Sequence, residues 1–335
     1  MSAMRIKWYD GAPPAAFAAA GPEGYPPEPP NAGARCAVAW RGDEPVARLA
    51  TYVAAELHGA PGVTGMIGHY AARDDVAGVV LLREAADGLA AAGSRRVLGP
   101  INGSTWSRYR LALPNDDSAV PEPPFLSEPQ NPPTYPLHFE QAGFAPAALY
   151  ESRVARDLSI ANPNAPAGLR AAEDRGIRIE PLRMERFDDE LRAIYDLSLV
   201  AFADNLFYSP IGWDEFRAMY APLRERLDPD LVLFARTPDA GLAAFALAFP
   251  DLLAVRQGRP YRVVVKSMAT AERWRGLGLG GLLLDEIRRL ALTKDYNAII
   301  HALIQVANYS RRISAHTAQP FRRYALYARA EPGVR

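Results

Sequence analysis

The feature that most constrains this chain is a glycine-rich stretch, ERWRGLGLGGLLLDEI, at residues 272–287. It follows the β-branched run YRVVVKSMAT (261–270) and opens a pattern with apolar residues at helical spacing. Glycines let the backbone approach a phosphate closely, and a helix N-terminus offers free N–H groups with a positive dipole end. Because three glycines within five residues weaken a helix start, we expect this strand–loop–helix unit to bind an anion rather than only to pack.

Two anion-binding patterns fit the same glycines. Gly276 to Gly281 match the dinucleotide fingerprint G-x-G-x-x-G, and the run from Arg275 matches R-x-x-G-x-G, a loop that would cradle the pyrophosphate of an acyl-coenzyme A. In a dinucleotide fold the glycines follow the strand almost at once, and an acidic residue ends the next strand. Here five residues separate Thr270 from Gly276, and Asp295 precedes the next apolar strand. The context therefore excludes the dinucleotide interpretation.

Composition excludes several classes of protein. The 335 residues include 38 basic and 38 acidic side chains, so no overall field attracts nucleic acid or an anionic membrane. The single cysteine, Cys36, excludes an internal disulfide and a multi-thiolate metal site, and we expect no metal. The N-terminus lacks an uninterrupted apolar signal-peptide core, and no apolar run approaches the ~18 residues of a spanning helix. We expect a soluble cytoplasmic protein with no nucleic-acid or membrane partner.

The chain divides into two similar halves. The segment ANPNAPAG (161–168) is typical of an interdomain linker. After it, the patterns predict strand, two helices, three strands, helix, strand, short helix and strand. The first half echoes this order as strand, hairpin, strand, helix, strand, and a helix end with a strand, and Asn102-Gly-Ser stands in the place of Asn308-Tyr-Ser. We interpret the chain as a duplicated α/β unit: a domain at 1–160, a linker at 161–171 and a domain at 172–335, each a mixed, mostly antiparallel sheet flanked by helices.

The second half, from about Arg178 to Arg329, resembles the GCN5-related N-acetyltransferase (GNAT) family. The resemblance is carried by the glycine loop, the elements that flank it and Asn308. The first half resembles the same fold, with HFEQAGF (138–144) close to the family's helix-to-strand ending. The whole chain is therefore similar to a tandem GNAT, which implies acetyl-coenzyme A as co-substrate. The coenzyme-binding residues that the resemblance implies are Met268, Ala269, Thr270, Arg275, Gly276, Leu277, Gly278, Leu279, Gly280, Asn308 and Arg311. The first three lie on the strand that, in the family, splays from its neighbour and hydrogen-bonds the pantetheine arm.

The first half departs from the pattern at its own anion site. Its strand–helix junction reads Ala-Arg-Asp-Asp-Val-Ala-Gly from Ala72 to Gly78, with two carboxylates where the second half has glycines. Negative charges at a helix N-terminus would repel a pyrophosphate. We predict that the first half has lost coenzyme binding and remains as scaffold and as one wall of the substrate cleft.

The implied chemistry is direct attack of an amine on the thioester, with a backbone N–H of the splayed strand stabilising the oxyanion. The family's usual acid, a tyrosine about seven residues past the asparagine, is replaced by Ala315, so the neighbouring His316 is the candidate acid. Asp251, at the end of an apolar strand, is the candidate base. Asn205 and Tyr208, in the mixed aromatic and polar loop at 203–213, are the candidate substrate contacts.

We expect an N-acyltransferase that moves an acetyl or other short acyl group from acyl-coenzyme A to a primary amine of a small molecule or peptide. Two alternatives stay open. A coenzyme A-sensing protein without turnover would fit the missing tyrosine. An aminoacyl transferase that uses charged tRNA is opposed by the neutral net charge.

Overall fold

A computed structural model describes residues 3–25, 28–31, 33–114, 122–256, 258–308 and 310–330. Tyr309, beside Asn308, lies outside these ranges. The strands of the first half are β1 (Met4–Asp10), β2 (Arg35–Arg41), β3 (Glu44–Ala54), β4 (Thr64–Ala72), β5 (Arg96–Gly99), β6 (Leu111–Ala112) and β7 (Ala145–Ala155). Its helices are α1 (Ala15–Ala19), α2 (Asp75–Ala91) and α3 (Tyr135–Gln141).

The second half begins with helix α4. Its strands are β8 (Arg178–Pro181), β9 (Val232–Arg236), β10 (Leu242–Pro250), β11 (Val255–Arg256), β12 (Arg259–Pro260), β13 (Arg262–Thr270), β14 (Ala298–Gln305) and β15 (Gln319–Ala330). Its helices are α4 (Ala165–Glu173), α5 (Phe187–Ala201), α6 (Trp213–Tyr220), α7 (Leu279–Thr293) and α8 (Ser310–Ser314).

One large sheet runs through both halves. Its strand order is β1-β2-β3-β4-β5-β15-β7-β14-β13-β10-β9-β8, and β6 pairs with β15 at the side. In the described residues only β4–β5 and β13–β14 pair in parallel, at the same place in each half. The mixed, mostly antiparallel sheet predicted from the sequence is therefore confirmed.

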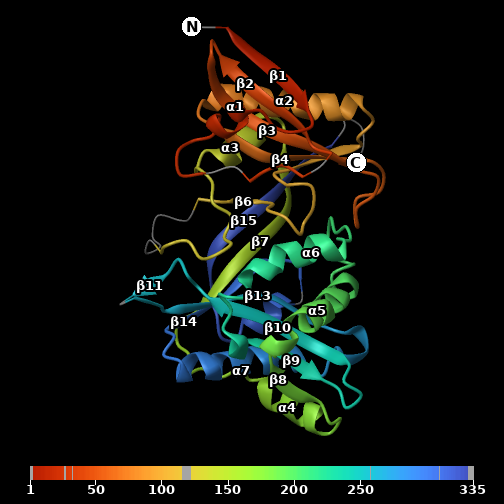
Figure 1. Cartoon of the computed structure of the whole chain (residues 1–335), viewed down its shortest axis with the longest axis vertical. Coiled ribbons are helices and arrows are strands. Elements are labelled where there is room, and N and C mark those ends of the chain that lie inside the picture. The colour runs from red at the N-terminus through yellow and green to blue at the C-terminus, as the bar shows by residue number, and fades with distance from the viewer. Residues whose placement is uncertain are drawn as a thin grey trace.

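The two halves exchange their last strands. The first half ends in β7, which pairs with β14 of the second half, whereas the chain ends in β15, which pairs with β5 of the first half. β7 and β15 also pair with each other along the middle of the molecule (Figure 1). Each half of the sheet is thus completed by a strand from the other half.

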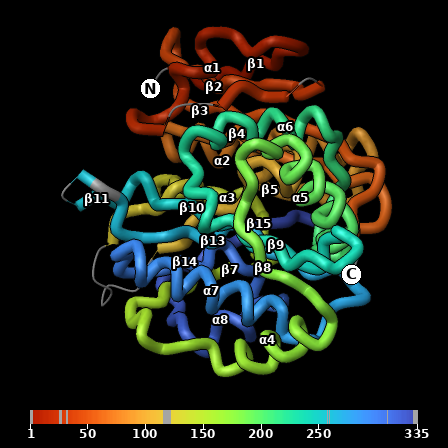
Figure 2. The backbone as a smooth tube through the Cα atoms, turned by 60° about the horizontal axis from the view of Figure 1, so that its bottom comes forward, coloured from red at the N-terminus to blue at the C-terminus, as the bar shows by residue number. Residues whose placement is uncertain are grey.

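The segment interpreted as a linker is mostly helical. Residues 165–173 form α4, which packs against α7 at one end of the molecule (Figure 2). The two predicted domains therefore share one continuous sheet. That the duplicated units meet at residues 161–171 remains our proposal.

The strand β10 shows why helices cover both faces of the second half. Its residues alternate in direction, as in any strand. Ala244, Ala246 and Ala248 lie in the core beneath α7. Phe245 and Leu247 lie in the core beneath α5 and α6 on the opposite face. A strand buried on both faces has a continuous run of apolar residues, and the sequence LAAFALAF of β10 is such a run.

The element order predicted for the second half is confirmed from β8 to β15. The structure adds α1, α4, β6 and the hairpin β11–β12, which the sequence did not predict. None of the helices in the described ranges is both long and apolar enough to cross a bilayer.

Candidate functional site

The glycine loop lies between β13 and α7, after a short 3-10 turn at Glu272–Trp274. Gly276 and Gly278 have φ of 81° and 79°, a left-handed conformation that only glycine adopts without strain. The first intrahelical bond of α7 runs from Leu282 N–H to Gly278 O (3.0 Å). The N–H groups at 279–281 therefore have no partner inside the helix, and such a terminus suits an anion.

The surroundings of this terminus fit an anionic group. Arg275 is exposed, and no ion pair among the described residues includes it. A Cβ added at Gly280 would lie 2.9 Å from Met268 Cε and 3.2 Å from Ile313 Cδ1. The glycine loop, β13 and α8 therefore converge at Gly280, where any side chain would fill the space.

Gly278 also has a packing role. A Cβ at Gly278 would lie 3.1 Å from Gly168 Cα, and a Cβ at Gly168 would lie 2.6 Å from Gly278 O. The close approach of α4 to the start of α7 thus depends on this pair of glycines. Tight helix packing, the plainer explanation of the glycines, applies at Gly278, whereas a Cβ at Gly276 would meet open space.

The strands β13 and β14 separate beside this loop. Their pairs run only from Arg262–Ala298 to Val265–His301. β13 continues to Thr270, paired with β10 on its other side, so the edge of residues 266–270 that would face β14 is unpaired. The three residues predicted to contact pantetheine lie in this range, at a strand edge with free backbone groups.

The structure brings two predicted sets of residues together. Asn308, predicted to bind the coenzyme, donates from Nδ2 to Oδ1 of Asn205, predicted to contact substrate, at 3.4 Å. Asn308 Oδ1 also accepts the N–H of Ser310 at 3.0 Å and so caps the start of α8. The loop at 203–213 therefore reaches the open end of the strand gap.

Tyr208 does not face open space. It is buried, its hydroxyl donates to Leu199 O (3.2 Å), and its ring lies 5.9 Å from that of Trp106. Burial raises the pKa of Tyr208. Two backbone bonds, His58 N–H to Tyr208 O (3.1 Å) and Phe207 N–H to His58 O (2.8 Å), join this loop to the first half. We infer that Tyr208 holds the loop in place.

Asp251, the candidate base, is a partner in a buried ion pair. Its Oδ2 accepts Arg262 Nε at 3.0 Å and Nη2 at 2.7 Å, and its Oδ1 accepts Leu126 N–H at 2.9 Å. Asp251 is 0% exposed and Arg262 is 1% exposed. A carboxylate with both oxygens occupied and no access to solvent is unsuited to take a proton from an incoming amine, so we infer a structural role.

Arg311 is also engaged. Its Nε donates to Glu151 Oε1 at 2.9 Å, and Arg153 Nη1 donates to the same oxygen at 2.6 Å. Burial alone would raise the pKa of Glu151, but the two arginines hold it below its usual value. Arg311 thus anchors α8 to β7. His316, the candidate acid, is exposed just past α8.

His301 is a core residue, as its apolar strand suggests. It is 6% exposed, and its Nδ1 has no hydrogen-bond partner among the described residues. Burial, with a smaller contribution from Arg153, lowers the pKa of His301 to about 4. It is therefore neutral at physiological pH.

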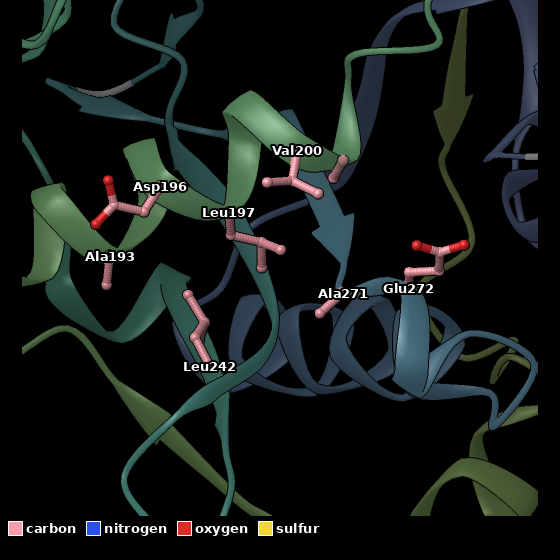
Figure 3. A pocket seen from close by; sticks show the side chains of 8 residues that line it. Ala193, Asp196, Leu197, Val200, Leu242, Ala271 and Glu272 are labelled. Atoms are coloured by element: carbon pink, nitrogen blue, oxygen red, sulfur yellow. The ribbon is translucent and has the colours of Figure 1, made fainter.

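The sequence did not predict a groove of about 340 Å³ between α5, the start of β10 and the end of β13. In Figure 3 two carboxylates, those of Asp196 and Glu272, lie on opposite sides of it with apolar side chains between them. Asp196 is paired with Arg192 (2.9 Å). The groove is lined by Ala193, Asp196, Leu197, Val200, Ala201, Leu242, Ala271 and Glu272. The sequence feature that could have indicated this groove is the helical spacing of Ala193, Leu197 and Val200.

The anion site of the first half holds its own carboxylate. Asp74 caps α2 by accepting Ala77 N–H at 2.9 Å, and it pairs with Arg41 Nη2 at 2.6 Å. Partial burial opposes ionisation, but these bonds lower the pKa of Asp74. The carboxylate occupies the helix terminus that a pyrophosphate would need.

Comparison with known proteins gives one curated relative and many similar folds. No protein-family model matches the sequence. The chain is 27% identical over 232 residues to the bacterial ceramide synthase of Caulobacter vibrioides (strain NA1000 / CB15N), which is 66% of this chain and 58% of that protein. The chain thus spans little more than half the length of this relative.

Several similar solved structures are GCN5-related proteins. A tandem GNAT protein from the clavulanic acid biosynthesis pathway has a TM-score of 0.52 at 14% identity, covering 99% of this chain and 100% of that chain. A GCN5-related N-acetyltransferase from Sphaerobacter thermophilus has a TM-score of 0.51 at 15% identity, covering 90% and 82%. The glucosamine N-acetyltransferase region of a fungal multi-domain GH3 β-N-acetylglucosaminidase has a TM-score of 0.54 at 13% identity, covering 88% of this chain and 33% of that chain. The chain has a tandem GNAT fold, as its sequence predicted.

Proposed function

We propose that this protein is an N-acyltransferase that transfers an acyl group from acyl-coenzyme A to a primary amine. The proposal rests on one observation, the unpaired edge of β13 beside the glycine start of α7. A phosphate-binding terminus next to a free strand edge suits a ligand with a pyrophosphate and an amide-containing arm. Arg275 and the N–H groups at 279–281 would hold the pyrophosphate, and Met268, Ala269 and Thr270 would hydrogen-bond the arm.

The reaction needs little from side chains. The amine nitrogen attacks the thioester carbonyl carbon, a C–N bond forms and the C–S bond breaks. The ammonium proton leaves to a base or to water, and the departing thiolate sulfur takes up a proton. A backbone N–H on the free edge of β13 would stabilise the oxyanion between these steps. His316 is the proposed proton donor, since it is exposed beside α8.

Thermal unfolding with acetyl-coenzyme A tests this proposal, with NADH and FAD as comparison ligands. A ligand at ~100 times its dissociation constant adds about 2.7 kcal/mol of stability. We expect acetyl-coenzyme A alone to raise the midpoint, and Arg275→Gln to abolish the rise. Arg289→Gln is the matched control, because it removes an exposed arginine farther along α7. No shift with acetyl-coenzyme A would overturn the proposal, and a shift without any product from amines would favour a coenzyme sensor.

We further propose an amine with a long hydrocarbon chain as the acceptor. Two observations support this choice over a small polar amine. The curated relative is named a ceramide synthase, and a ceramide is the N-acyl derivative of a long-chain amino alcohol. The groove between α5 and β13 has an apolar lining with Glu272, a carboxylate, at its rim. Glu272 follows the free strand edge by two residues, so an ammonium held there would lie near the thioester.

The chain-length dependence of the rate tests this acceptor. Each buried methylene contributes about 0.8 kcal/mol, or roughly fourfold in kcat/KM, so 2-aminoalkanols should improve as acceptors as their chains lengthen. Val200→Asp, at a side chain 65% exposed on the groove, should remove this gain; Val76→Asp, 67% exposed on α2, is the control. Equal rates for short and long chains would instead indicate a small polar acceptor.

A further inference from the structure

Strand β14 is distorted where it leaves β13. Its pairing with β7 shifts register between His301 and Ile304, so two residues of β14 oppose one residue of β7. Leu303, in this bulge, has φ of 58°. A left-handed conformation is costly for leucine and persists only where the surroundings fix it. The surroundings of Leu303 therefore identify what maintains the bulge.

Two side chains from the first half bind both backbone groups of Leu303. The N–H of Leu303 donates to Ser152 Oγ at 3.0 Å, and Arg110 Nη1 donates to Leu303 O at 3.0 Å. Ser152 lies on β7 and is 0% exposed; Arg110 precedes β6 and is 8% exposed. Both are therefore buried at the junction of the halves.

Both side chains are themselves fixed. Ser152 Oγ donates to the hydroxyl of Tyr324 at 3.1 Å, and that hydroxyl donates to Glu128 Oε1 at 2.6 Å. The donors run in one direction, from the Leu303 N–H to the buried carboxylate, so each hydroxyl has a defined orientation. The guanidinium of Arg110 packs against the rings of Tyr109 (3.7 Å to the centroid) and Tyr150 (4.1 Å).

We propose that Ser152 and Arg110 are positioning residues for acyl transfer, which hold Leu303 in its left-handed conformation and keep β13 and β14 apart. The parallel pairs stop at His301, immediately before the bulge, and bulges bend and twist the strand that carries them. β13 is irregular at the same level, where Lys266 is an extra residue in its pairing with β10, and the bulge in β14 directs that strand away from the edge at 266–270. The first half thus serves the site of the second half. This inference rests on the proposed function.

The test combines acetyl-coenzyme A binding with hydrogen exchange on the full chain. Ser152→Ala and Arg110→Met each remove one bond to Leu303, and we expect each to weaken acetyl-coenzyme A binding roughly tenfold. Hydrogen exchange at Leu303 should accelerate in Ser152→Ala. Arg110→Lys keeps a donor and should bind more tightly than Arg110→Met. Adding Leu303→Gly to Ser152→Ala should restore binding, since glycine adopts positive φ without strain.

Thr51→Val is the control, because it removes a buried hydroxyl whose bond to Arg35 O (3.3 Å) lies within the first half. A merely structural role for Ser152 would give the same binding constant per folded molecule in Ser152→Ala and Thr51→Val, with no rescue by Leu303→Gly. That result would overturn the inference. If the unmodified chain fails to bind acetyl-coenzyme A, the proposed function fails; exchange at Leu303 that is unchanged in Ser152→Ala would still overturn the positioning role.

Discussion

Asn102 Oδ1 accepts the backbone N–H of His69 at 2.8 Å. His69 lies on β4 beyond the pairs with β5, which end at Met66–Leu98. His69 is thus the first-half counterpart of the free edge on β13. Its backbone N–H is already bonded to the side chain of Asn102, which belongs to the same half. Asn102 also donates to Glu28 Oε2 at 3.3 Å, which fixes the carboxamide there.

From this contact and from Asp74 at the start of α2 we predict one coenzyme per chain. We expect isothermal titration with acetyl-coenzyme A to give a stoichiometry of about one. Arg275→Gln should remove all of this binding, because it changes the site in the second half. A second equivalent bound with comparable affinity, or full residual binding in Arg275→Gln, would contradict the loss of the first site.

Asp251→Asn should destabilise the chain without slowing acyl transfer in the molecules that remain folded. Breaking this buried ion pair leaves Arg262 with Glu122 as its remaining carboxylate partner (3.0 Å), and losing a buried ion pair costs up to roughly 3–5 kcal/mol. Urea denaturation measures the loss of stability, and kcat per folded molecule measures the chemistry. A normal midpoint with a large fall in kcat would instead establish Asp251 as the base.

Gly168→Ala should destabilise the protein although alanine is the better helix former. The gain of about 1 kcal/mol in helix propensity is outweighed, because the new Cβ would lie 2.6 Å from Gly278 O and overpacking costs roughly 1–3 kcal/mol. Gly88→Ala on α2 is the matched control: its Cβ meets nothing within 4 Å, so it should stabilise. Chemical denaturation of both variants checks the opposite signs.

The buried His301 should make stability depend on pH between about 6.5 and 4. Its pKa is about 4 in the folded chain and ~6.5 when unfolded, so in this window the unfolded chain binds a proton that the folded chain does not. The free energy of unfolding should therefore fall as the pH falls, and His301 should account for up to about 3 kcal/mol of this loss. Above pH 7 the titration of His301 should have no effect on stability. Urea midpoints of wild type and His301→Leu at pH 7 and pH 4.5 measure this; equal pH dependence in both would refute it.

Local patterns in the sequence determined most of the elements and predicted the candidate anion site. The β-branched run before Thr270, the glycines at 276–280 and the apolar spacing of α7 all act within about 30 residues. Periodicity and glycine conformation depend on neighbours along the chain, so they can be inferred without the fold. The same holds for the two acidic residues at the start of α2, which marked the first half as different.

Only the tertiary structure decided which strands and side chains complete the site. β7 and β15 change halves, and Ser152 reaches Leu303 across 151 residues of sequence. Asp251 is occupied by Arg262 because the chain reverses between β10 and β13 and brings them into contact. Contacts of this kind arise from strand order and from closing long loops, which no local pattern encodes. The sequence by itself determined the glycine start of α7, and the exchange of strands decided which residues surround it.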